Sequence, residues 1–141
     1  MDDKKSRTAL MHCEALGELA FDVFTNSQYA YYMTALEAQG SGVAFGELAV
    51  HTRFSMSYAA YQSMKLYYFT NRTEISSAII DEFLGAYGTF SRFFSGGLIT
   101  SIGIDIIAER FSDFEAAFGR LQELLSATRE RYGTHRGTMV N

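Results

Sequence analysis

The chain contains no proline, and this absence bears on every helix that it could form. At ordinary usage, a chain of 141 residues would hold about seven prolines. Proline breaks a helix interior because it lacks the N–H group and its ring clashes with the preceding turn. The sequence therefore permits long helices, although the absence of proline alone does not require them.

Apolar residues recur at intervals of three and four along most of the chain, which is the spacing of one helical face. This spacing predicts a helix over about 6–24 and another over about 27–39, with Asn26 or Ser27 as the cap of the second. Gly40-Ser41-Gly42 is expected to form a loop after it.

The segment 44–70 fits two interpretations. Its alternating serines and its run of β-prone residues suit strands, but no Gly or Asn divides it into a hairpin, so a helix is favoured. The helical interpretation places seven residues near one face: Leu48, His51, Phe54, Tyr58, Tyr61, Met64 and Tyr68.

Two capping boxes predict where later helices begin. Asn71 precedes Glu74, and Ser112 precedes Glu115, by the three residues that let the two side chains satisfy free N–H groups. They predict helices over about 72–94, ended by Ser95-Gly96-Gly97, and over about 113–131, with Gly133 as a cap. A further helix is predicted over about 100–111.

The fold expected from these elements is all-α, a compact single-domain bundle of five or six helices over residues 1–141. Residues 1–5 and 134–141 are expected to be frayed tails. Hydrophobic residues make up 48% of the chain, with twelve Phe and nine Tyr, so the core has ample material. The chain has more aromatic rings than a monomer of this size is expected to bury.

Composition limits the classes of function. A net charge of −4 argues against general nucleic-acid binding. The single cysteine, Cys13, cannot form an internal disulfide and fits a reducing compartment. No apolar run of 18 residues is present, and the charged first residues do not form a secretory signal. A cytoplasmic protein with no membrane partner is expected.

No cluster of residues points to catalysis, a metal or a cofactor. Glu47 and His51 stand one helical turn apart, but two ligands do not make a metal site, and an ordinary helical pair explains them. Cys13 cannot be activated by His12, because neighbours on a helix point about 100° apart. Phosphate-binding loops and nucleophile elbows are absent from the sequence. The sequence favours a non-enzymatic function.

Two features indicate contact with another molecule. Glycines interrupt helical segments at Gly17, Gly85, Gly88 and Gly119, where a helix or a ligand can approach closely. Tyrosines occupy more than one helical face, and Tyr is enriched at interfaces. Six are predicted to bind a partner: Tyr29, Tyr31, Tyr32, Tyr61, Tyr67 and Tyr68.

The expected function is therefore a protein-interaction module, acting as a homodimer or as an inhibitor, adaptor or regulator of a larger partner, as a phage or mobile-element factor would. The alternative is a helical domain that binds a small molecule in an aromatic pocket. Five residues would line that pocket: Phe54, Tyr58, Phe83, Tyr87 and Phe90.

Overall fold

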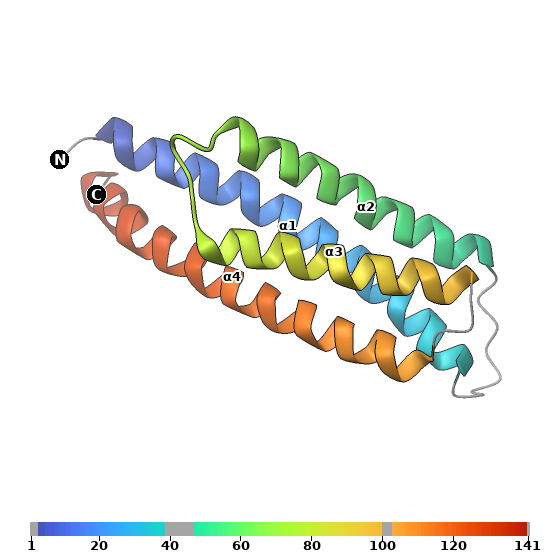
Figure 1. The fold of residues 1–141 in the computed structure, drawn as a ribbon. Helices are drawn as coiled ribbons and strands as arrows, with labels where there is room; N and C mark the ends of the chain where they lie inside the picture. The colour runs from blue at the N-terminus through green and yellow to red at the C-terminus, as the bar shows by residue number, and fades with distance from the viewer. Residues whose placement is uncertain (1–2, 39–46, 100–102, 141) are drawn as a thin grey trace.

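Four antiparallel helices form the part of the chain that the computed structural model describes, residues 3–38, 47–99 and 103–140 (Figure 1). They are α1 (Asp3–Ala38), α2 (Glu47–Thr70), α3 (Ala78–Ile99) and α4 (Ile104–Val140). Successive helices run in opposite directions, so both termini lie at one end of the bundle. The all-α bundle is confirmed, but the predicted number of five or six helices is wrong. The predicted loop at Gly40-Ser41-Gly42 lies outside the described residues.

α1 is one helix because its inward stripe runs through the break predicted near Asn26. The Asn26 amide donates to the Asp22 carbonyl at 2.9 Å, and the Ser27 hydroxyl donates to the Val23 carbonyl at 2.7 Å. Both side chains thus bond back within a continuous helix instead of capping a new one. Inward residues follow alternating steps of four and three: Ala9, Cys13, Leu16, Ala20, Val23, Ser27 and Ala30.

α4 likewise passes through the predicted cap at Ser112, which is an exposed residue inside the helix. Large side chains recur on both sides of it at the same steps: Ile107, Phe111, Phe114, Phe118, Leu121 and Leu125. Such a stripe favours one long helix over two. Gly133, predicted as a cap, is also inside α4, and Gly96-Gly97 is inside α3. Fraying at the chain ends stays a prediction.

The capping box predicted at Asn71 is wrong, because Asn71 lies in the connection between α2 and α3. Asn71 closes α2 instead, since its amide donates to the Tyr67 carbonyl at 2.8 Å, and residues 71–74 form a turn. The cap of α3 is Ser77, whose hydroxyl accepts from the Ile79 N–H at 3.1 Å. The Tyr68 hydroxyl accepts from the Ser77 N–H at 3.0 Å and donates to the Ser77 carbonyl at 3.2 Å, which fixes the connection.

α2 confirms a helix over the described part of 44–70, but its buried face differs from the predicted one. Leu48 and Tyr58 are exposed, and so is His51. The predicted set began with two steps of three residues, and each such step turns about 60° away from a fixed face. The observed stripe is Val50, Phe54, Ser57, Tyr61, Met64 and Tyr68.

The core is unevenly filled. α1 contributes mainly small side chains, so its backbone lies close to α2 and α4. α3 and α4 contribute stacked rings, among them Phe90 and Phe114, whose centroids lie 5.8 Å apart. Rings also separate α2 from α3, where Tyr61 packs on Tyr87 at 4.6 Å, so these two helices make few close backbone contacts.

Candidate functional site

The six tyrosines predicted to bind a partner do not form one surface. Tyr29 and Tyr32 are about half exposed, at 51% and 47%. Tyr31 stacks on the buried Phe111 with 4.5 Å between ring centroids, and the Tyr61 ring packs against Tyr87 at a tilt.

Tyr67 and Tyr68 make hydrogen bonds inside the bundle. Tyr68 is fully buried and holds the connection at Ser77, so its side chain does not reach the surface. Tyr67 contacts His12, with 2.6 Å between its hydroxyl and His12 Nδ1. Of the six, Tyr29 and Tyr32 therefore present the most ring surface to solvent.

A surface that sequence reasoning missed lies along α2, on the side away from the core. The large apolar side chains on it are Leu48, Met56, Leu66 and Phe69, of which Leu48 is 81% exposed and Leu66 70% exposed. We call this strip the α2 outer face, and it is completed by exposed uncharged residues: Thr52, Ser55, Ala59, Gln62, Ser63 and Thr70.

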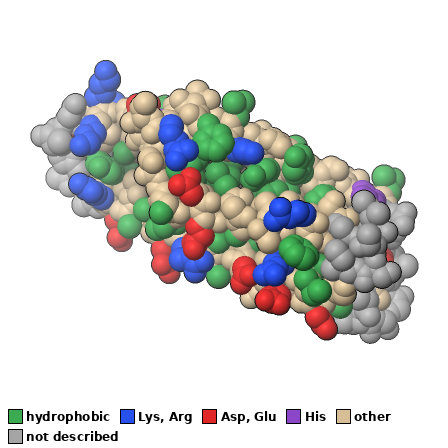
Figure 2. All heavy atoms as spheres, in the orientation of Figure 1, with side chains coloured by type: hydrophobic (Ala, Val, Ile, Leu, Met, Phe, Trp, Pro, Cys, Tyr) green, Lys and Arg blue, Asp and Glu red, His purple; other side chains and the backbone are tan. Residues whose placement is uncertain are grey.

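The α2 outer face is unusual in its charge. Residues 48–70 contain no Asp or Glu. The two full cations of this segment are engaged, since Arg53 lies over the Tyr29 ring at 4.7 Å and Lys65 over the Tyr61 ring at 5.5 Å. By contrast, acidic side chains gather along the edge of the molecule formed by α4 (Figure 2). The signal available in the sequence was this acid-free run of residues, rather than the tyrosines.

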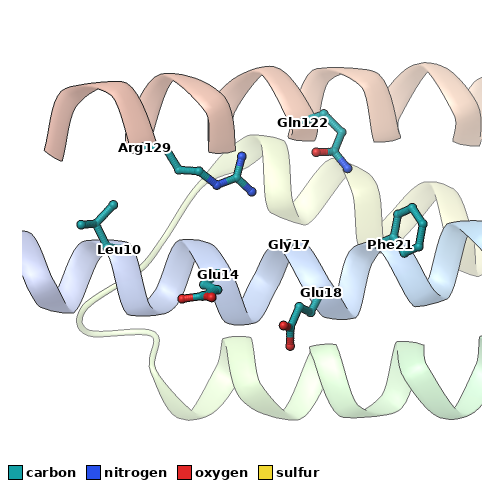
Figure 3. A pocket seen from close by; sticks show the side chains of 7 residues that line it. All are labelled: Leu10, Glu14, Gly17, Glu18, Phe21, Gln122 and Arg129. Carbon is teal, nitrogen blue, oxygen red and sulfur yellow. The ribbon is translucent and has the colours of Figure 1, made fainter. Parts of the chain in front are cut away.

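A groove of about 560 Å³ lies where α1 meets α4 (Figure 3). Its centre is Gly17, where an added Cβ would lie 3.2 Å from Arg129 Nη2 and 3.6 Å from Leu125 Cδ1. Gly17 therefore allows a close helix approach inside the monomer. Gly85 and Gly119 have no such neighbour within 4 Å. Glu14 and Glu18 line the groove from α1, opposite Arg129, and exposed Phe21 adds an apolar wall.

A second cavity, of about 790 Å³, lies at the end of the bundle that holds both termini. We call it the end cavity; it is built from the start of α1, the residues around the start of α3 and the later part of α4. Its most buried polar side chain is His12, with 4% of the side chain exposed. The His12 Nε2 lies 3.2 Å from Glu74 Oε1.

The hydrogen bonds of His12 follow from its partners. An ionised carboxylate only accepts, so His12 Nε2–H donates to Glu74, and in the neutral imidazole Nδ1 then accepts from the Tyr67 hydroxyl. Burial, with a contribution from Glu74, raises the pKa of Tyr67. The Tyr67 phenol therefore stays protonated and acts as a hydrogen-bond donor.

Cys13 also lines the end cavity and is buried, with its thiol 3.2 Å from the Leu125 carbonyl oxygen. Burial raises the pKa of this thiol, which opposes a nucleophilic role. Cys13 belongs to the hydrophobic core.

The described side chains bring together no group of three or more His, Cys, Asp or Glu that could hold a metal. His51 is exposed on α2, and the Glu47 side chain lies outside the described side chains. Of the residues expected to line the alternative aromatic pocket, Phe83, Tyr87 and Phe90 are fully buried and pack on other rings, and that alternative stays a prediction.

Comparison with known proteins finds no matching family model, no similar curated protein and no similar solved structure. Within the described residues, no helix has the length and apolar character needed to cross a bilayer.

Proposed function

We propose that the chain is a non-enzymatic protein-interaction module that pairs with a second copy of itself through the α2 outer face. The observation that supports this most is an exposed helix with large apolar side chains and no acidic residue from 48 to 70. Charged residues are depleted, and aromatic residues and Met enriched, at the cores of protein interfaces.

A second copy suits this face because the face is uncharged. Two identical charged surfaces would repel each other across a two-fold axis, whereas two strips without Asp or Glu meet without that cost. The charged residues of α4 lie on another side of the bundle and would stay in solvent.

The size of the face sets the expected strength of the pairing. A helix of 24 residues is roughly 36 Å long and about 12 Å across with its side chains, so the strip covers roughly 430 Å². Two such strips bury about 860 Å², less than stable interfaces bury and in the range of weak, transient pairs. The dimer should therefore form and dissociate with concentration, which suits a module that regulates, inhibits or recruits a larger protein.

Sedimentation velocity over micromolar to millimolar concentrations tests this proposal. The wild-type mass should rise from 15.8 kDa toward twice that value. Leu66→Lys should stay monomeric, because it places a charge within the strip, at a position that is 70% exposed and contributes little to the core.

Ile106→Lys is the matched control, since Ile106 is an exposed apolar residue on α4, away from the strip. It should dimerise as the wild type does. A wild-type chain that stays at 15.8 kDa throughout, or a Leu66→Lys chain that dimerises normally, would show the proposal to be wrong.

A further inference from the structure

We infer that the end cavity binds an amphipathic carboxylate, meaning an acyl or aryl body that ends in a carboxylate group. This inference concerns a site separate from the α2 outer face and does not depend on dimerisation. It rests on the cavity's apolar floor, on the charges at its rim and on the helix end beside it.

The floor of the end cavity is apolar. It consists of side chains from three helices that belong to the core or pack against it: Cys13, Leu16, Ile80, Leu124 and Leu125. A volume of about 790 Å³ lies within the range of small-molecule sites, which bury an apolar body and fix it with a few polar groups. A bare phosphate or other small ion would leave this floor uncovered.

The rim of the end cavity is cationic. Lys4, Lys5 and Arg131 line it, against one carboxylate, Glu74. With His12 counted as neutral and Lys4 left out of the count, Lys5 and Arg131 set two positive charges against one negative charge, in a chain whose net charge is −4. The Glu74 carboxylate already accepts from His12 at 3.2 Å, so part of its charge is compensated within the protein.

The start of α3 also favours a negatively charged group in the end cavity. Ser76 and Ser77 line the cavity directly before the helix that begins at Ala78. A helix N-terminus carries a partial positive charge and favours an anion. An apolar floor, a cationic rim and a helix N-terminus at one opening together match a carboxylate on an apolar tail. They do not match a cation or a neutral lipid.

Three probes with one ten-carbon chain test the inference: decanoate, decanol and decyltrimethylammonium. Isothermal titration calorimetry, below the concentrations at which the probes aggregate, should show decanoate binding about tenfold tighter than decanol, because the cationic side chains at the rim act on the carboxylate in a partly desolvated site. The ammonium should bind most weakly. Equal affinities for all three, or no binding of decanoate, would overturn the inference.

Variants place the binding in the end cavity. Lys5→Gln combined with Arg131→Gln should lower the affinity for decanoate about tenfold and leave that for decanol unchanged. Lys65→Gln combined with Arg92→Gln is the matched control, since it removes the same charge outside the cavity lining, and it should bind decanoate as the wild type does. An equal loss in both pairs would mean that only the overall charge matters, and the site would be rejected.

Two further variants separate this site from the α2 outer face. Ala127→Trp adds an indole to the lining at an exposed position, so the fold is retained while the affinity for decanoate falls. Leu66→Lys should leave decanoate binding intact, whatever it does to dimerisation. If Leu66→Lys abolished binding and Ala127→Trp did not, the probe would bind on α2, and the inference would be wrong.

Discussion

At the scale of single residues, the centre of the bundle depends on a buried hydroxyl pair. The Tyr87 hydroxyl donates to Ser57 Oγ at 2.8 Å, and Ser57 donates onward to the Phe54 carbonyl at 2.7 Å. Both residues are fully buried. Burial raises the pKa of Tyr87 well above its ordinary value of 10.0, so the phenol stays a donor.

Ser57→Ala is expected to lower the free energy of unfolding by about 1–3 kcal/mol, because it leaves the Tyr87 hydroxyl buried without its acceptor. Tyr87→Phe in the same chain should recover part of that loss. Urea denaturation of the two single variants and the double variant gives the coupling energy. Losses that simply add would contradict the pairing.

The helical glycines differ in what surrounds them, and substitution by alanine should separate them. Gly119→Ala is expected to raise the free energy of unfolding by about 0.5–1 kcal/mol, because the position is helical and nothing lies within 4 Å of the added Cβ. Gly17→Ala should gain less, since its Cβ displaces the end of the Arg129 side chain. Thermal denaturation measures both. A less stable Gly119→Ala chain would indicate a partner packed there.

The tyrosines show how far residue-scale prediction from sequence can go. A surplus of rings over core space was visible in the composition, but the fate of each ring depends on partners far along the chain. Tyr68 is buried because its hydroxyl meets the backbone at Ser77, and Tyr67 meets His12 across 55 residues. Neither contact can be predicted from the spacing of residues within one helix.

At the scale of elements, two serines test where the helices begin. Ser77 is the observed cap of α3, whereas Ser112 was predicted to be a cap and lies inside α4. Ser77→Ala should lower the free energy of unfolding by about 1 kcal/mol, because the Ile79 N–H loses its acceptor at the start of α3. Ser112→Ala should change it by less than about 0.5 kcal/mol, because Ser112 is an exposed residue within α4.

Urea denaturation compares the two chains, with exposed Ser76→Ala as a control beside the true cap. A larger loss for Ser112→Ala than for Ser77→Ala would mean that α4 begins anew at residue 112 and that the described helix is wrong.

The existence of helical segments was predictable from the three- and four-residue spacing, except over 44–70, where the lack of a residue that could make a hairpin turn favoured a helix. Their boundaries were not. Ser, Asn and Glu at the right spacing suit both a cap and a position inside a helix, where Ser27 and Asn26 bond to the preceding turn. The deciding information was the unbroken stripe from Ala9 to Ala30, and from Ile107 to Leu125.

At the scale of the whole molecule, folding makes several tyrosine hydroxyls and one cysteine thiol harder to deprotonate. Burial is the main cause that raises the pKa values of Tyr31, Tyr67 and Tyr87, and of Cys13. The folded state keeps these protons at a pH where the unfolded chain, with ordinary values of 9.0 for the thiol and 10.0 for the phenols, releases them.

The bundle should therefore keep its full stability below 9.0 and lose it progressively as the pH rises through and above 9.0–10.0. Tyr87→Phe should make that loss shallower, because one buried phenol no longer has to ionise. Urea denaturation at a series of alkaline pH values measures the slope. Stability that does not depend on pH, or identical slopes for wild type and variant, would contradict this expectation.

The candidate sites also belong to this scale. The end cavity joins the start of α1, the α2–α3 connection and the later part of α4, three segments far apart in the sequence. Only the up-and-down path of four helices brings them to one end, and a prediction with five or six helices could not place them together. The α2 outer face required the correct buried stripe of α2 to be known first.

The small inward residues of α1 have a consequence for how this sequence can change. Ala20, Val23, Ser27 and Ala30 are fully buried between helices that lie close on either side. A larger side chain at any of them would push two neighbouring helices apart at once. The outward positions of α4 carry no such restriction on size, whereas any change at the inner stripe of α1 is limited to small residues.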